Sequence, residues 1–210
     1  MSKQQLRLYY HPFSRAVNVL WMLEELGQPY ELEYIDLQSG AQHTSTFLAL
    51  NPMGKVPVLA DGDTIVTESA AIGLYLADRY GLGGLAPRFD DPARGTYLRW
   101  SLFAPSVIET GAYAKAAKWE YRAPQAGWGE YESMLATTES AIGEGPWLLG
   151  ERFTMADVIF GGTVRSLLRF EMIEARPALT AYAARLSERP AAQATQAKNA
   201  AMIEKYGLKP

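Results

Sequence analysis

The chain has 210 residues, of which 48% are hydrophobic, and a formal net charge of −3 at pH 7; this is enough for one large domain or two small ones. It contains no cysteine, which excludes disulfides, thiolate metal sites and a cysteine nucleophile. The two histidines, His11 and His43, lie in unrelated segments, no basic stripe is present, and no run approaches about 18 apolar residues. We therefore expect no metal, no nucleic-acid partner and no membrane partner, and the lack of a leader pattern favours the cytoplasm.

Strand and helix patterns alternate in the first part of the chain. Apolar residues at three- and four-residue spacing predict a first helix that ends at Gly27, and period-two runs predict the strands. In chain order, the predicted elements are a strand at 6–10, a helix at 14–26, a strand at 30–35, a short helix, a hairpin of 56–60 and 64–67, and a helix at 69–80. The order βαβαββα predicts an α/β domain.

The second part of the chain carries helical patterns only. The glycine-rich stretch 81–87 suits neither helix nor strand, so we place a linker at 82–91. The predicted helices are 91–119, 128–143, 154–170, 177–187 and 190–204. We therefore expect an α/β domain at 1–81 and an all-helical domain at 92–210, with a ligand crevice between them.

A proline near the start of a predicted strand marks the segment 50–59. Pro57 cannot donate a hydrogen bond to the strand ladder, so it lies at a sheet edge, at a bulge or after a cis peptide bond. Taken alone, the position favours the sheet edge, because cis bonds precede only about 5–6% of prolines.

A second signal is the pair Glu68-Ser69 at the start of the predicted helix 69–80. Free N–H groups and the positive end of the helix dipole make such a terminus suitable for binding a carboxylate. The alternative is that Ser69 only caps the helix.

Together these segments resemble the glutathione-binding half of the cytosolic glutathione transferases, and 147–158 resembles their helical half. The resemblance spans nearly the whole chain. It implies a thioredoxin-like N-terminal domain and a C-terminal helical bundle. Thr154 and Asp157 have the spacing of a helix capping box, and Phe153 and Val158 have the spacing of a hydrophobic staple. We therefore assign these residues a role in folding and not in catalysis.

The resemblance also implies how glutathione is held. Val56, before a cis Pro57, offers its backbone N–H and C=O to the cysteinyl part. Glu68 and Ser69 hold the γ-glutamyl end. Lys55, Gln42 and His43 lie where family members hold the glycyl carboxylate, although exposed side chains of these types are often only solvated.

The catalytic position is expected at or after the end of the first strand. Ser14 is similar to the serine-type classes, which are theta- or delta-like, and its hydroxyl is aimed at the glutathione sulfur. The alternatives are that Ser14 only caps the helix, or that Tyr9, Tyr10 or His11 fills this role. Since neighbouring strand residues face opposite ways, at most one of the two tyrosines can face the site.

Apolar side chains are candidates for the second substrate site. These are Phe13 and, on the helix predicted at 91–119, Trp100, Phe103, Ile108, Tyr113 and Trp119. Aromatic residues at helical spacing more often fill a core.

The resemblance implies a homodimeric detoxification enzyme that conjugates the glutathione thiolate to small hydrophobic electrophiles. A thiol has a pKa near about 8.5, so the enzyme has to lower it. Other readings on the same scaffold are a glutathione-dependent isomerase, peroxidase or dehalogenase, and a non-catalytic binding module.

Overall fold

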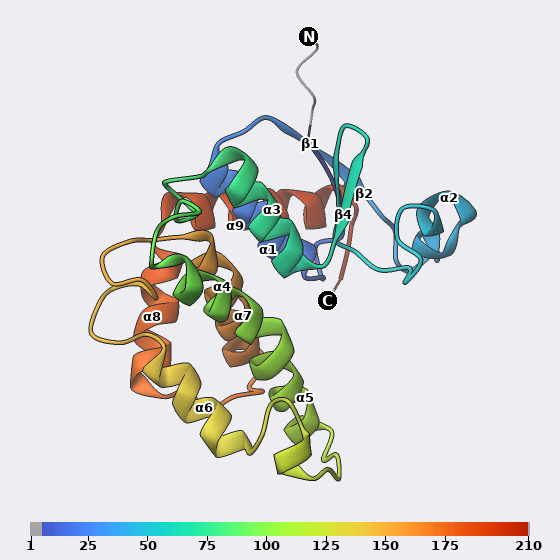
Figure 1. The fold of residues 1–210 in the computed structure, drawn as a ribbon. Coiled ribbons are helices and arrows are strands. Elements are labelled where there is room, and N and C mark those ends of the chain that lie inside the picture. The colour runs from blue at the N-terminus through green and yellow to red at the C-terminus, as the bar shows by residue number, and fades with distance from the viewer. Residues whose placement is uncertain (1–5, 210) are drawn as a thin grey trace. The chain divides into compact units, whose positions relative to one another are not determined.

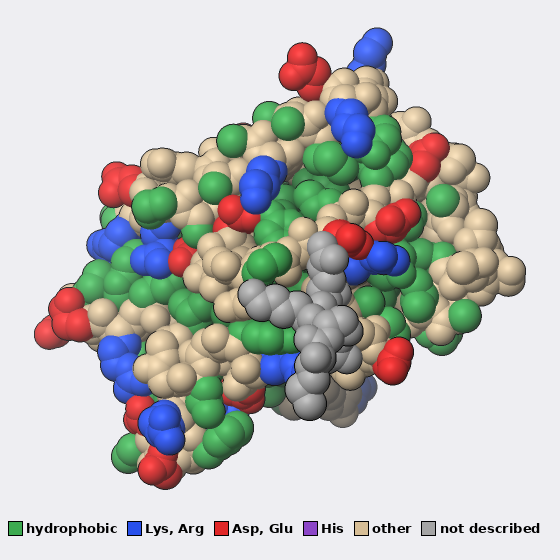
Figure 2. Space-filling view, turned by 90° about the horizontal axis from the view of Figure 1, so that it is seen from above, with side chains coloured by type: hydrophobic (Ala, Val, Ile, Leu, Met, Phe, Trp, Pro, Cys, Tyr) green, Lys and Arg blue, Asp and Glu red, His purple; other side chains and the backbone are tan. Residues whose placement is uncertain are grey.

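The computed structural model describes residues 6–209, which form two compact units (Figure 1). The first unit contains the chain up to Leu76 together with the segment from Arg189 onward, and the second unit is Ala77–Glu188. Within the described residues, none of the helices combines the length and the apolar character needed to cross a bilayer. Figure 2 shows positive and negative side chains interspersed with hydrophobic ones on one face, consistent with the small net charge.

The first unit is built on a mixed four-stranded sheet with the order β2-β1-β3-β4. Its elements are β1 (Leu6–Tyr10), α1 (Ala16–Leu26), β2 (Tyr30–Tyr34), the 3-10 turn η1 (Ala41–His43), α2 (Ser45–Leu48), β3 (Val58–Asp61), β4 (Thr64–Thr67), α3 (Ser69–Tyr80) and α9 (Pro190–Lys205). β1 and β2 are parallel and joined by α1, whereas β3 is antiparallel to both β1 and β4. The order and pairing confirm the predicted βαβαββα layout.

The amino-acid pattern explains the first strand and helix. Leu6, Leu8 and Tyr10 of β1 are buried and alternate with more exposed residues, as a strand with one covered face requires. α1 ends where Gly27 adopts a left-handed conformation (φ 63°) and its N–H bonds to the Leu23 carbonyl, which a residue with a Cβ tolerates less well.

The last helix, α9, packs on α1, and the two lie side by side in Figure 1. The sequence places this helix in the second domain, whereas the structure groups it with the first unit. Ion pairs join the two helices: Arg189, the N-cap of α9, bonds both carboxylate oxygens of Glu25 at 2.7 Å, and Lys198 bonds Glu24 at 2.6 Å. These pairings are side-chain contacts that periodicity does not reveal.

The second unit consists of helices around α7 (Met155–Arg169), which is buried along most of its length. The other elements are α4 (Arg94–Phe103), the π-helical segment η2 (Ala104–Glu109), α5 (Thr110–Ala116), η3 (Ala123–Gln125), α6 (Tyr131–Ser140) and α8 (Pro177–Ser187). The carboxylate of Asp157 accepts hydrogen bonds from Thr154 N–H, Leu148 N–H and the Tyr182 hydroxyl, each at 2.9 Å. This is the structural role expected for the capping box.

The predicted single helix 91–119 is wrong in one respect: it is three consecutive segments, α4, η2 and α5. Pro105 lies at the start of η2 and has no N–H for the helical ladder. A π-helical turn takes up the change in register, as is typical where an α-helical ladder is interrupted.

Candidate functional site

The strand pairings bring the ends of all four strands together along one side of the sheet, perpendicular to the strand direction. β1 and β2 run parallel, with Tyr10 opposite Tyr34, so both strands end on this side. β3 begins there, with Val58 opposite Tyr9 of β1, and β4 ends there, with Thr67 opposite Val58. We call this place the motif edge; it comprises residues 11–14 after β1, 55–57 before β3, and 68–69 after β4. Three sequence motifs that are far apart along the chain therefore meet.

The segment before β3 presents a backbone edge. The peptide bond between Val56 and Pro57 is cis, as the resemblance implies. Among residues 6–209, neither the N–H nor the C=O of Val56 has a backbone partner. The buried Asn51 holds the preceding turn, because its amide donates to the Lys55 carbonyl at 2.8 Å and its oxygen accepts the Met53 N–H at 3.1 Å. This segment therefore has a free strand-like edge on a fixed turn.

The segment after β4 presents a helix N-terminus. The first backbone bond into α3 runs from Ile72 N–H to the Glu68 carbonyl (2.9 Å), so the N–H groups of residues 69–71 have no partner within the helix. Ser69 is half-buried, and no described residue bonds its hydroxyl. Glu68 has a positive φ of 65°, which is uncommon for a residue with a side chain and is often found at functional sites.

The residues proposed for the glycyl carboxylate lie around Gly54. A Cβ at this position would be 2.8 Å from Nδ1 of His43 and 3.2 Å from the Gln42 carbonyl, so only glycine allows the turn to pack on η1. His43 and Lys55 are exposed, and the side-chain oxygen of Gln42 is buried without a partner among the described residues. The structure thus brings Gln42 and His43 against the turn that carries Lys55.

Ser14 lies between β1 and α1. Its hydroxyl donates to the His11 carbonyl at 2.7 Å and accepts the Ala16 N–H at 3.1 Å. The second bond connects the hydroxyl to the first turn of α1, where the helix dipole favours a nearby anion. The side chain is half-buried and lies at the motif edge.

His11 has a buried ring, with 6% of its surface exposed. Its Nδ1 accepts the Phe13 N–H at 3.2 Å, so the proton of the neutral ring is on Nε2, which has no partner among the described residues. Burial lowers the pKa of His11, and the charge of Asp36 opposes this shift only in part. The ring is therefore neutral near pH 7.

The two tyrosines at the end of β1 differ in their surroundings. Tyr10 is fully buried and its hydroxyl donates to Asn199 of α9, which argues against Tyr10 as a donor to a ligand. Tyr9 is half-buried with its ring against Phe47. The Tyr9 and Phe47 rings meet edge to face, with centroids 6.0 Å apart and an interplanar angle of 81°.

The residues proposed for the electrophile differ in burial, and Phe103 is half-buried with its ring against Trp100 (centroids 5.3 Å apart). Phe13 and Tyr113 are exposed, as is Trp119. Trp100 and Ile108 are buried in the second unit, where Trp100 contacts Phe160, so the structure argues against these two as ligand contacts. Their helical spacing reflects core packing, which was the alternative interpretation.

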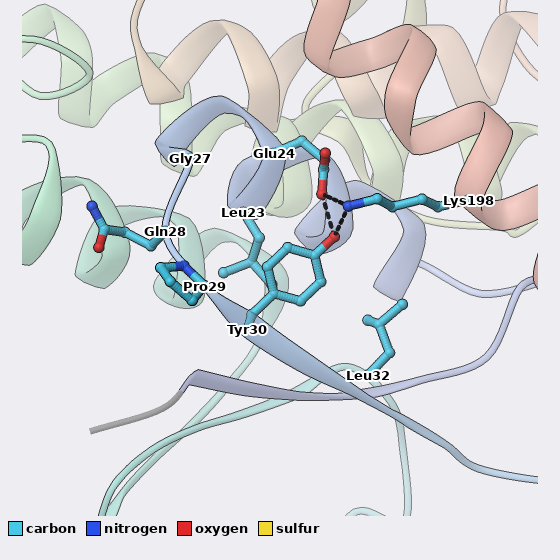
Figure 3. Close-up of a pocket in the computed structure, with 8 residues that line it drawn as sticks. All are labelled: Leu23, Glu24, Gly27, Gln28, Pro29, Tyr30, Leu32 and Lys198. Carbon is cyan, nitrogen blue, oxygen red and sulfur yellow. Dashed lines mark hydrogen bonds and ion pairs between the residues drawn. The ribbon is translucent and has the colours of Figure 1, made fainter. Parts of the chain in front are cut away.

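Within residues 6–209, no three histidine, aspartate or glutamate side chains are grouped closely enough to hold a metal ion. A surface hollow of about 620 Å³ lies away from the motif edge, at the start of β2, where Tyr30, Glu24 and Lys198 bond one another (Figure 3). The sequence reading missed Asn51, for which an asparagine before Pro-x-Gly was an available turn signal. It also missed Tyr34 and Tyr206, whose stacking has no signature in the sequence.

The fold and the motif edge define a thioredoxin-like protein with a helical C-terminal unit. The model of the glutathione S-transferase N-terminal domain matches residues 4–78, and that of the C-terminal domain matches residues 111–185. The chain therefore belongs to the glutathione transferase family and is a glutathione transferase.

Relatives and a solved structure agree with this assignment. Glutathione S-transferase 3 of Zea mays is 31% identical over 91% of this chain and 93% of its own length. Glutathione S-transferase GstB of Escherichia coli K12 is 31% identical over 82% of this chain and 88% of its own length. A glutathione transferase from Burkholderia graminis, whose structure holds two glutathione molecules per subunit, is 29% identical to this chain with a TM-score of 0.75. The match covers 91% of this chain and 87% of the other.

Proposed function

We propose that this transferase binds glutathione along the motif edge. Val56 pairs through its backbone with the cysteinyl part, and Ser69 with the N-terminus of α3 binds the γ-glutamyl carboxylate. Lys55, Gln42 and His43 surround the glycyl carboxylate. The observation that carries this proposal is the set of unused donors and acceptors at one edge, since the N–H and C=O of Val56 have no backbone partner there and the Ser69 hydroxyl is free among the described residues.

Ser14 stabilises the thiolate in this proposal. A free thiol with a pKa near about 8.5 is only a few per cent ionised at pH 7. A hydroxyl bond to the sulfur anion contributes about 1.5–3 kcal/mol and the N-terminus of α1 up to about 1 kcal/mol more. Together these contributions, about 1.5–4 kcal/mol, lower the thiol pKa by about one to three units, to neutrality or below, without a general base.

The reaction is attack of this thiolate on an electrophilic carbon of a small hydrophobic compound. Phe13, which is next to Ser14 at the motif edge, is an exposed aromatic side chain suited to such a compound. The test is retention on immobilised glutathione, followed by thiol consumption with a panel of aryl halides, enones, epoxides and hydroperoxides. Conjugate formation supports the proposal. Turnover without a conjugate would instead assign an isomerase, peroxidase or dehalogenase, and retention without any turnover would assign a binding module.

A second candidate follows from the two glutathione molecules in the Burkholderia graminis structure. A first glutathione thiolate attacks a disulfide and releases one thiolate; a second attacks the mixed disulfide, giving glutathione disulfide and the second thiol. This exchange needs no cysteine from the chain, which has none. Titration calorimetry distinguishes the candidates: one glutathione per chain favours conjugation, and two favour disulfide reduction.

The oligomeric state and location belong to the same proposal. We place the enzyme in the cytoplasm as a homodimer, which is usual for this family. Exposed apolar side chains, Met53 and Ile65 in the first unit and Leu102 in the second, supply contact surface for a second copy.

A further inference from the structure

Three aromatic rings of the first unit form a continuous stack that begins at the motif edge. The His11 ring lies on Tyr34, with centroids 5.8 Å apart and an interplanar angle of 28°. Tyr34 lies in turn on Tyr206, with centroids 3.9 Å apart and an angle of 13°. We call these three residues the aromatic column. It connects the turn after β1 with the last residues of the chain.

Two hydrogen bonds connect His11 to the turn that carries Ser14. The Nδ1 atom accepts the Phe13 N–H at 3.2 Å, and the carbonyl accepts the Ser14 hydroxyl at 2.7 Å. A rotation of the ring would break the first bond and loosen the turn that leads to Ser14. The orientation of the ring therefore affects where the Ser14 hydroxyl lies.

Nothing polar fixes the other side of this ring, because Nε2 has no partner among the described residues. The ring is instead held by packing against Tyr34 and the edge of Phe13 (5.9 Å, 60°). Tyr34 is the last residue of β2 and is only half-buried. The Tyr34 ring stacks on Tyr206 as well as on His11.

Tyr206 is held in place by a helix that is bonded to the sheet and to α1. It is the C-cap of α9, and its N–H bonds to the Met202 carbonyl at 3.2 Å. Along α9, Lys198 bonds Glu24 at 2.6 Å and the Tyr30 hydroxyl at 2.9 Å (Figure 3). Arg189 and Asn199 bond α1 and β1, as described above. The position of Tyr206 is therefore fixed relative to the motif edge.

We propose that Tyr206 is a positioning residue of the thiol site, which acts through Tyr34 and His11 on the hydroxyl of Ser14. The inference rests on the proposed role of Ser14 in stabilising the thiolate. In this proposal, the turn after α9 affects the pKa of the bound thiol although it does not contact the sulfur.

The test compares Tyr206→Ala with Tyr206→Phe, which retains the ring. Phe170→Ala is the matched control, because Phe170 is also an exposed aromatic C-cap residue, at the end of α7 in the other unit. Ultraviolet thiolate absorbance against pH gives the pKa of bound glutathione. Titration with S-methylglutathione, which has no thiol, gives the affinity of the remaining contacts.

For Tyr206→Ala we expect a rise of about half a unit to one unit in the pKa of the bound thiol, and a loss of about three- to tenfold in kcat/KM at pH 7. Affinity for S-methylglutathione should stay within about twofold, and Tyr206→Phe and Phe170→Ala should match the unmodified protein. An unchanged thiol pKa in Tyr206→Ala, or an equal loss of S-methylglutathione affinity, overturns the proposal.

Two further measurements complete the test. In a Tyr34→Leu background, Tyr206→Ala should have no additional effect on the thiol pKa; an additive effect overturns the route through Tyr34. If the unmodified protein binds neither glutathione nor S-methylglutathione, the proposed function itself fails. If it binds both and Ser14→Ala leaves the thiol pKa unchanged, the assignment of Ser14 fails.

Discussion

The hydroxyl of Ser14 has one proton, and the bound sulfur would compete for it with the His11 carbonyl, which accepts it at 2.7 Å. When the hydroxyl donates to a bound thiolate instead of to this carbonyl, a hydrogen bond worth about 0.5–1.5 kcal/mol is lost and one worth about 1.5–3 kcal/mol is formed. At the mid-points of these ranges the net gain is about 1.2 kcal/mol, or about one pKa unit. For Ser14→Ala we therefore expect the pKa of bound glutathione to rise by about one unit, and turnover at pH 7 to fall about tenfold where thiolate formation limits the rate.

The pH dependence of turnover in Ser14→Ala tests the same assignment. Since the variant's thiol ionises at higher pH, raising the pH should recover part of the lost turnover. Ultraviolet titration of the bound thiolate should show the shift for Ser14→Ala but not for Tyr9→Phe, because the Tyr9 ring packs against Phe47 and phenylalanine at this position retains that contact. A shift in the tyrosine variant alone would identify a tyrosine-type enzyme.

The hydroxyl of Ser69 is expected to act on affinity. In Ser69→Ala, the proposed bond to the γ-glutamyl carboxylate is lost, which weakens glutathione binding by about 1–3 kcal/mol, while the α3 backbone donors remain. Titration calorimetry measures this, with Ser106→Ala as the control, since Ser106 is an exposed helical serine in the other unit. Equal affinities for Ser69→Ala and the unmodified protein would mean that Ser69 has only a structural role.

At the scale of the helices, Gly161 allows α7 and α8 to pack closely. A Cβ at Gly161 would lie 2.1 Å from Cδ1 of Leu186 and 3.3 Å from the Tyr182 ring. Alanine normally stabilises a helix by about 1 kcal/mol relative to glycine, but overpacking costs about 1–3 kcal/mol. The contact is so short that we expect overpacking to dominate in Gly161→Ala.

The matched variant is Gly95→Ala in α4, where nothing lies within 4 Å of the added methyl group. Chemical denaturation should show Gly161→Ala with a lower free energy of unfolding than the unmodified protein, and Gly95→Ala with an equal or slightly higher one. Stabilisation by both variants would show that α7 and α8 separate without cost.

Elements were predictable to different degrees. The helix at 69–80 occurs as predicted because its start signal and its apolar period agree. The strand predicted at 56–60 begins later, at Val58, because Pro57 cannot join the ladder. The π-helical segment was not predicted, since a proline among helical residues indicates a break but not the register that replaces it.

For the whole molecule, we expect a homodimer. Sedimentation at micromolar concentration should give about twice the chain mass of 23.2 kDa. The driving force would be burial of exposed apolar side chains such as Met53 and Leu102. Their replacement by glutamate should shift the mass toward the monomer, whereas Tyr121→Glu, at an exposed residue that is not among those proposed for the interface, should not. A monomer mass for the unmodified protein contradicts the prediction.

Patterns along the chain were enough to predict the family, the α/β and helical halves, and the segments that carry the candidate site. These depend on local signals: hydrophobic period, caps, and proline and glycine positions. Three-dimensional packing was needed to find that Tyr10 is bonded within the core, that Trp100 and Ile108 are buried, and that α9 joins the first unit. The same holds for Tyr206 on Tyr34. Such facts depend on contacts between residues far apart in the chain, and a residue's type and spacing do not specify which partner covers it.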